Sequence, residues 1–174
     1  MACGRRVALL LIALFLGLCP NAVESQCQSE LNGRCLKVLD QAATFYAAKT
    51  ACAAAAAGGQ LAELVTAQED NTLRQISGYS TWFLWVSLVQ DDDQSSPEVG
   101  WYWVGQDGQR TPLDTGQSPW APKNPNDNGN TGEDNEENRG ALRNGNGQVA
   151  DMSANYAASF PVCWMDSGSQ RLSW

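Results

Sequence analysis

The sequence predicts an α+β fold with two helices, several short strands and one long irregular loop. Helix signals occur early in the chain, at residues 44–57 and 67–76. Apolar runs of strand length follow, the longest at residues 82–89. Residues 120–151, called here the oxygen-rich stretch, are rich in Asn, Asp, Glu and Gly and have little apolar content from which to build a core. Helices and strands that pack together, joined to a polar loop, are typical of a domain whose loop carries its function.

The N-terminus has the features of a secretory signal peptide. Two arginines precede an apolar run of about a dozen residues, and small residues precede Gln26. Residues 1–25 are therefore predicted to be removed, leaving residues 26–174 as one domain. The apolar run is shorter than the roughly 20 residues that a spanning helix needs, which disfavours the alternative of an uncleaved anchor. We expect a secreted, extracellular protein without membrane insertion.

Composition excludes several functional classes. Removal of the signal lowers Lys+Arg from 11 to 9 and Asp+Glu from 19 to 18, which leaves a net charge of about −9. An acidic surface argues against nucleic acid and anionic membranes as partners. The chain has no histidine, so the usual Ser/His/Asp and Cys/His nucleophiles and histidine-bearing zinc sites are excluded. A glycosidase with paired carboxylates stays formally open, but we expect no enzyme.

Four cysteines remain after removal of the signal, and an even number in an oxidising compartment predicts two disulfides. Cys27 and Cys35 flank the dipeptide Asn32-Gly33, which is a strong signal for a tight hairpin turn. A bridge between these two cysteines would clamp the hairpin. A short strand is expected next, at residues 36–39.

Two helices are expected after the hairpin. The first covers residues 44–57, where a threonine caps an alanine-rich run that two glycines end. Its apolar spacing turns Cys52 inward. The second covers residues 67–76, because Thr66 and Glu69 form a capping-box pattern just before it.

Strands are expected elsewhere. The continuous apolar run at residues 82–89 predicts a buried strand, and residues 101–104 alternate as a strand does. Residues 59–65 are predicted to be a short buried strand or an extended link. Residues 160–163 are the last predicted strand, and residues 164–174 are expected to be a short tail.

A set of short motifs is spread in a specific order over the mature chain. They are Cys27 with Cys35, Cys52 with Gly58-Gly59-Gln-Leu-Ala, Ala67-Gln-Glu-Asp-Asn, Leu84-Trp-Val-Ser-Leu88, Glu98-Val-Gly-Trp-Tyr-Trp103, Trp120, Asn124-Pro-Asn126, Glu137-Asn138 and Cys163. In this order they resemble the C-type lectin-like domain family, in its long form with an N-terminal hairpin bridge. The resemblance implies two helices flanking antiparallel sheets with a long irregular loop region. It also implies a bridge between Cys52 and Cys163, and a core position for Trp120.

The resemblance places a calcium and sugar site in the oxygen-rich stretch. Calcium-dependent members of the family hold the cation with a Glu-Pro-Asn or Gln-Pro-Asp triplet, a later Glu and a Trp-Asn-Asp triplet. Two adjacent sugar hydroxyls complete the shell of six to eight oxygens that calcium takes. The matching positions here are Asn124, Asn126, Glu137 and Asp151, with a cis bond implied before Pro125. Glu133 is an alternative to Glu137.

The sequence departs from the family pattern at this site. Asn124 is an amide where the family has Glu or Gln, and Ala150 offers no side-chain oxygen. Arg139 and Ala154 stand where the family has two bridged cysteines. Fewer charged ligands and a looser loop predict weak calcium binding, near the millimolar range. The alternative is a degenerate site in a solvated loop.

A weaker second calcium site is implied by the resemblance at Asp91, Glu98 and Asp127, with a solvated acidic face as the alternative. The sequence therefore predicts a carbohydrate-binding recognition protein, assisted by calcium, that takes part in innate defence. Its expected partners are glycans, including those on microbial surfaces. The alternative is a calcium-independent module of the same fold that recognises a protein or another surface.

Overall fold

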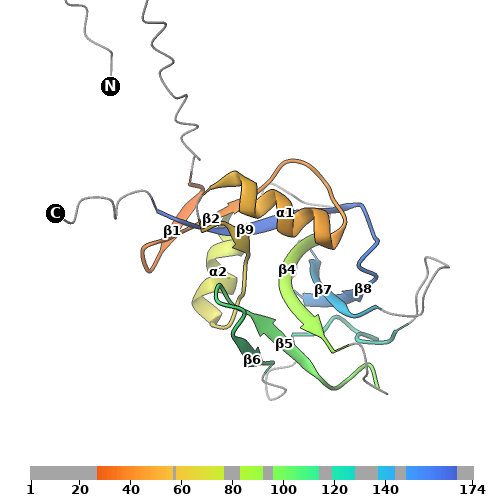
Figure 1. The fold of residues 1–174 in the computed structure, drawn as a ribbon. Helices are drawn as coiled ribbons and strands as arrows, with labels where there is room; N and C mark the ends of the chain where they lie inside the picture. Colours follow the sequence, from red (N-terminus) through yellow and green to blue (C-terminus); the bar gives the residue numbers. More distant parts are fainter. Residues whose placement is uncertain are drawn as a thin grey trace, which may run out of the picture.

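The computed structural model describes residues 27–56, 58–76, 83–91, 96–113, 119–127, 137–143 and 148–167 (Figure 1). The predicted signal peptide lies outside these ranges. Within them the chain forms two helices and nine strands, which confirms the α+β class. In chain order they are β1 (Ser29–Leu31), β2 (Arg34–Val38), α1 (Phe45–Ala55), β3 (Gln60–Leu61), α2 (Ala67–Ile76), β4 (Phe83–Gln90), β5 (Trp101–Val104), β6 (Arg110–Pro112), β7 (Arg139–Arg143), β8 (Gln148–Met152) and β9 (Ser159–Asp166).

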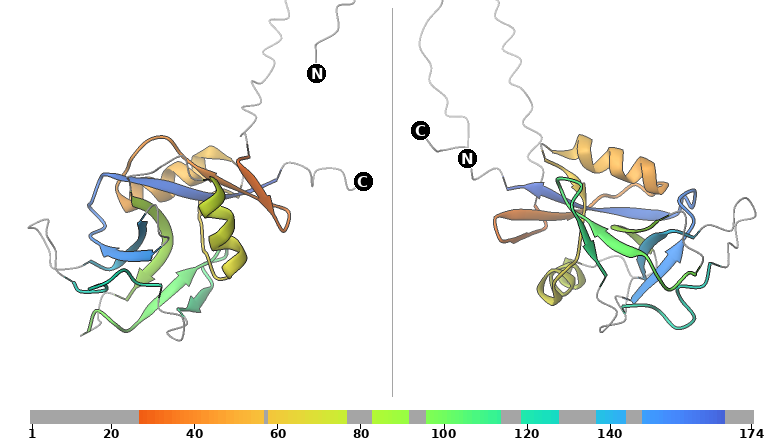
Figure 2. Two further views of the ribbon diagram at one scale, coloured as in Figure 1. Left: turned by 180° about the vertical axis from the view of Figure 1, so that it is seen from behind. Right: turned by 60° about the horizontal axis from the view of Figure 1, so that its bottom comes forward.

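The strands form one mixed, branched sheet around β9. The main path runs β1-β2-β9-β4-β5-β6, while β3 also pairs with β9 and β7 joins β4 to β8. Strand β9 is antiparallel to β2 and parallel to β4. Helix α1 lies on one side of β2 and β9, whereas α2 and strands β4 to β8 lie on the other (Figures 1 and 2). The last strand is therefore the axis on which both halves of the domain pack.

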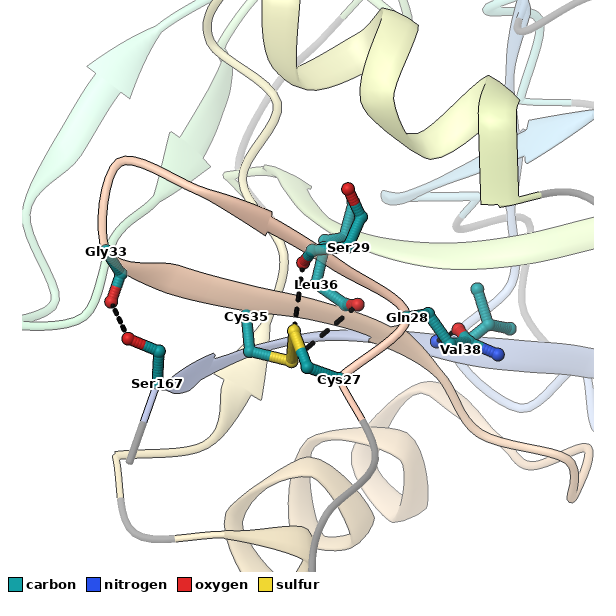
Figure 3. The surroundings of a disulfide bond; sticks show 8 residues. All are labelled: Cys27, Gln28, Ser29, Gly33, Cys35, Leu36, Val38 and Ser167. Carbon is teal, nitrogen blue, oxygen red and sulfur yellow. Dashed lines mark hydrogen bonds between the residues drawn. A yellow bond between two sulfur atoms is a disulfide. The ribbon is translucent and has the colours of Figure 1, made fainter. Parts of the chain in front are cut away.

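The predicted N-terminal hairpin is confirmed. Asn32 and Gly33 form the turn with φ values of 52° and 75°, in the left-handed region that this pair of residues tolerates. Cys27 and Cys35 form the predicted disulfide, with 5.4 Å between their Cα atoms. The hydroxyl of Ser167 donates to the carbonyl of Gly33 over 2.7 Å (Figure 3). The hairpin is thus tied both to itself and to the end of β9.

Helix α1 begins and ends close to the prediction. The Thr44 hydroxyl accepts a first-turn N–H over 3.4 Å, as an N-cap does. The helix ends before Gly58, whose φ is 69°, and a Cβ atom at Gly59 would collide with the carbonyl oxygen of Cys52. Both positions therefore require glycine. The predicted Cys52–Cys163 disulfide ties this helix to β9.

Helix α2 covers the predicted residues and has the predicted capping box. The Thr66 hydroxyl accepts the N–H of Glu69 over 3.2 Å, and the Glu69 carboxylate accepts the N–H of Thr66 over 2.9 Å. Leu73 turns inward and is buried. Neither α1 nor α2 is long and apolar enough to cross a membrane, and the described part of the chain has no other helix.

The prediction that residues 164–174 form a tail is wrong for residues 164–166, which belong to the last strand. Strand β9 continues to Asp166, because β2 and β3 pair with it from both sides. Trp164 is buried, its indole N–H donates to the carbonyl of Glu63 over 2.9 Å, and the Arg34 guanidinium lies 4.7 Å from its ring centroid. Pairing on both edges, rather than local pattern, sets the length of this strand.

Three strands were not predicted: β6, β7 and β8. The last two lie inside the oxygen-rich stretch, which is therefore not a loop throughout. Their sequences are short and contain charged residues, so they gain their strand conformation from pairing with each other and with β4. Conversely, the extended segment predicted at residues 59–65 contains only the two residues of β3 as strand.

Two apolar clusters lie on opposite sides of β9. One contains Phe45, Cys52 and Trp85 and is covered by α1, and the other contains Trp101 and residues facing α2. Trp120 packs on Trp101 with 4.8 Å between ring centroids, as its expected core position implies. Trp120, at the start of the oxygen-rich stretch, is thereby held against the core.

Candidate functional site

The residues expected to bind calcium come from β8 and from the connection between β6 and β7, called the long loop below, whose described parts are residues 113, 119–127 and 137–138. The start of the described part of this loop runs beside β8. The Ala121 N–H donates to the carbonyl of Val149, whose own N–H donates to the carbonyl of Pro119, each over 2.7 Å. The peptide bond between Asn124 and Pro125 is cis, as expected. These contacts bring the Asn-Pro-Asn triplet beside the C-terminal half of β8.

Asp151 is the centre of the site. It is only 2% exposed, and its Oδ2 atom accepts the backbone N–H groups of Asn126 over 2.6 Å and of Asp127 over 2.8 Å. Its Oδ1 atom is also buried and has no hydrogen-bond partner among the described residues. One oxygen of this carboxylate therefore orders the Asn126–Asp127 segment, and the other does not take part in that contact.

The second end of the loop is held by Asp127. Its Oδ1 atom accepts the N–H of Glu137 over 3.0 Å, and its φ of 51° lies in the left-handed region that Asp adopts more readily than most residues. The side-chain amide of Asn126 donates to the carbonyl of Lys123 over 2.8 Å. Hydrogen bonds thus link three of the predicted ligand positions: Asn126 bonds directly to Asp151, and Glu137 is linked to Asp151 through Asp127.

The donor set fits a hard cation. Burying a carboxylate oxygen without a partner costs free energy that a cation or a donor would recover. Amide oxygens at Asn124 and Asn126 and carboxylates at Glu137 and Asp151 are the ligand types that calcium prefers. In the described ranges, however, no three Asp, Glu, His or Cys residues cluster as a metal site. Calcium binding by these residues therefore stays a prediction.

The sequence departures have clear structural counterparts. Ala150 is buried in β8, where it pairs with Ala141, and it offers no oxygen. Glu137 is partly buried at the end of the loop. Glu133, its alternative, lies outside the described residues, so the choice between them stays a prediction.

Two of the three residues of the second predicted calcium site, Asp91 and Asp127, bind other partners. Asp91 accepts from the Arg110 guanidinium over 2.8 Å and from the Tyr102 hydroxyl over 3.0 Å. Burial, and then this hydrogen bond to Asp91, raises the pKa of Tyr102. Glu98 is exposed in the turn before β5, and Asp127 binds the long loop. Asp91 already has a cationic partner, which is a reason against a second calcium site there.

The two positions of the missing family bridge both contact the first turn of α1. Arg139 is 7% exposed, and its Nη2 donates to the Tyr46 hydroxyl over 3.0 Å. Its guanidinium carbon lies 5.3 Å from the ring centroid of Phe45. The carbonyl of Ala154 accepts the N–H of Phe45 over 3.0 Å. The contact of Arg139 with α1 was not predicted from the sequence. The signal that could have indicated it is an arginine at a position where the family has a bridged cysteine.

A mixed sheet with two flanking helices and two disulfides, one of them clamping an N-terminal hairpin, is the architecture of a C-type lectin-like domain. The chain belongs to the family of the Lectin C-type domain, whose model matches residues 41–163. C-type lectin domains are generally non-enzymatic binding domains, and they commonly bind calcium. The search of curated proteins gives no match.

Solved structures of the family share the fold. The carbohydrate-recognition domain of the mouse scavenger receptor C-type lectin is 20% identical, with a TM-score of 0.61, over 79% of this chain and 94% of that one. The cow CD23 domain, solved in the presence of a GlcNAc2Man3 oligosaccharide, is 23% identical, with a TM-score of 0.58, over 77% and 88%. The lectin CEL-I from Cucumaria echinata is 20% identical, with a TM-score of 0.60, over 78% and 92%. At these identities the likeness shows the fold.

Proposed function

We propose that this protein is a secreted lectin that binds carbohydrate at the long loop, assisted by a weakly held calcium ion. Asn124, Asn126, Glu137 and Asp151 are the proposed ligands. When bound, calcium supplies open coordination positions for two adjacent sugar hydroxyls. The protein's own side chains accept hydrogen bonds from the same hydroxyls.

One observation carries the proposal: the buried, unpartnered Oδ1 atom of Asp151 in the part of the chain that the structure describes. The opposite oxygen of the same carboxylate is used twice, by the N–H groups of Asn126 and Asp127. This fixes the side chain, so Oδ1 cannot turn to solvent without breaking two hydrogen bonds. A cation ligand is the role that fits an oxygen held in this way.

Family membership, the two disulfides and the predicted signal peptide support secretion and an extracellular role. Glycans on cell or microbial surfaces are the proposed partners, in innate defence. Two of the three structural neighbours named above are described as carbohydrate-recognition domains, and one of these two was solved in the presence of an oligosaccharide.

A glycan array, read in 10 mM calcium and again with excess chelator, tests the proposal. We expect binding to one class of glycan that falls at least about tenfold in chelator, and a similar fall for Asp151→Asn in calcium. Asp107→Asn, which makes the same change at an exposed aspartate in the turn between β5 and β6, outside both predicted sites, is the matched control and should bind as the wild type does. A glycan signal in neither condition would refute the lectin function.

The alternative function is a calcium-independent module that recognises a protein or another surface. Asp151 favours it in one respect, because its two hydrogen bonds order the Asn126–Asp127 segment without a metal. Ala150 favours it too, since the residue removes one family ligand. Tryptophan fluorescence separates the two functions: Trp120 lies at the start of the loop, so a saturable change on calcium titration counts against this alternative.

A further inference from the structure

Arg139 is a buried cation that the proposed site does not use as a ligand. It begins β7, immediately after the end of the long loop, and is 7% exposed. Arginine is seldom buried to this extent unless specific partners hold it. The partners of Arg139 therefore indicate what it does.

The guanidinium joins two separate elements. Its Nη1 donates to the carbonyl of Asn138 over 2.7 Å, and its Nη2 donates to the Tyr46 hydroxyl of α1 over 3.0 Å. The Asn138 carbonyl also accepts the N–H of Gln90 over 3.0 Å. The planar fork of arginine suits such a double contact, because its donors are held in fixed relative directions. Arg139 thus ties the end of the long loop to the first turn of α1.

Aromatic rings complete the contact. The guanidinium carbon lies 5.3 Å from the ring centroid of Phe45 and 5.8 Å from that of Tyr46. Cation–π contacts at such distances are stabilising, more so when they are buried. Phe45 is itself buried and packs edge-on against Trp85. Phe45 therefore places one side of this contact in the core, whereas Tyr46 lies at the surface.

Arg139 faces away from Asp151, the central predicted ligand. In the antiparallel pair of β7 and β8, Arg139 is opposite Met152, whereas Asp151 is opposite Gly140. Opposed residues share a face and neighbours along a strand alternate, so Arg139 and Asp151 point to opposite faces of the sheet. Replacing Arg139 removes no ligand atom.

We propose that Arg139, anchored by Tyr46 and Phe45, is a positioning residue for the long-loop site. It holds the Asn138 carbonyl, and thereby sets Glu137, whose N–H reaches Asp127. The N–H of Asp127 donates to the Asp151 carboxylate, so the position of Asp127 in turn affects the carboxylate at the centre of the site. A non-covalent clamp thus acts at the two positions, Arg139 and Ala154, where the sequence lacks a bridge. The functional part of this inference rests on the proposed calcium site.

The experiment compares four single variants. Arg139→Met removes the fork, Arg139→Lys keeps one charged donor, and Tyr46→Phe removes only the phenol that accepts from Nη2. Arg143→Met is the matched control, an exposed arginine on the same face of the same strand. Amide hydrogen exchange by NMR follows the N–H of Glu137 and, as a remote reference, that of Ala62, which donates to Val162 on β9. Calorimetric calcium titration and thermal unfolding complete the set.

We expect exchange at Glu137 to rise about tenfold in Arg139→Met and about threefold in Tyr46→Phe, with Ala62 unchanged. Calcium dissociation constants should rise by similar factors, with Arg139→Lys intermediate and Arg143→Met unchanged. Tyr46 is 56% exposed, so its phenylalanine variant should fold normally.

Two results would overturn the positioning role. One is Glu137 exchange that stays at the wild-type rate in both Arg139→Met and Tyr46→Phe. The other is faster exchange at Glu137 and Ala62 alike, which would show a general loss of stability. If the wild type binds no calcium, the proposed site fails, but the exchange measurement still decides whether Arg139 positions Glu137.

Discussion

Replacing Asp151 by asparagine separates its two roles. The amide keeps one oxygen that can accept the N–H groups of Asn126 and Asp127, so the loop contact survives in part. The buried Oδ1, which has no partner within the described ranges, is replaced by an NH2 group without negative charge. We therefore expect Asp151→Asn to fold in chelator and to lose the response to calcium.

The size of the response follows from the weak site. A dissociation constant near 1 mM and 10 mM calcium give a stabilisation of RT ln 11, about 1.4 kcal/mol. For a domain of about 150 residues, each kcal/mol raises Tm by about 2–4 °C. The wild type should therefore melt about 3–6 °C higher in calcium than in chelator.

Scanning calorimetry of both proteins, with 10 mM calcium or with chelator, measures this difference. Magnesium at the same concentration controls for general salt effects, because magnesium demands a tighter octahedral shell. The reasoning fails if the wild type shows no calcium-dependent rise in Tm, or if Asp151→Asn shows the same rise. In the first case the calcium-independent function becomes the better proposal.

Three further predictions concern the scaffold. Replacing Cys52 and Cys163 by alanine should lower the free energy of unfolding by about 4 kcal/mol, measured by urea denaturation, because the bridge closes a sequence separation of 111 residues. Since the pKa of Tyr102 is raised above 10.0 in the folded state, its contribution is present below that pH and is lost as pH rises through the folded pKa. Tyr102→Phe should therefore cost about 1 kcal/mol near neutral pH and make the alkaline decline shallower in urea titrations between pH 8 and 11. Gly140→Ala should lower the free energy of unfolding by about 1–3 kcal/mol, because its Cβ would meet the Leu88 side chain at 2.8 Å.

Each of these has a clear contrary outcome. An unchanged free energy of unfolding without the Cys52–Cys163 bridge would mean that the bridge does not restrict the unfolded chain as expected. An alkaline decline that is the same with and without the Tyr102 hydroxyl would assign that decline to other groups. A neutral or stabilising Gly140→Ala would show that the neighbouring leucine can move aside.

Local chemistry made several elements predictable from sequence. Asn32-Gly33 specifies a left-handed turn whatever surrounds it, and the box of Thr66 and Glu69 satisfies its own helix end. Two glycines end α1 because no side chain fits there. The candidate ligands could be named as well, since a resemblance in motif order carries residue positions directly.

The rest depended on partners distant in sequence. Strands β7 and β8 are short segments of mixed polarity that become strands because they pair with each other and β7 pairs with β4. Trp164 is core only because β2 and β3 enclose β9 on both edges. No local pattern contains that information, because a short strand takes its stability from its neighbours.

The sequence alone determined which side-chain oxygens this protein can offer, because residue type decides ligand chemistry. Only the tertiary structure decided how they are used. It brought the Asp151 carboxylate to the N–H groups of Asn126 and Asp127, and it placed Arg139 on the opposite face of the sheet, in contact with α1. Hydrogen bonds between residues 24 and 93 positions apart depend on how the sheet brings the chain together, and that arrangement is a property of the whole fold.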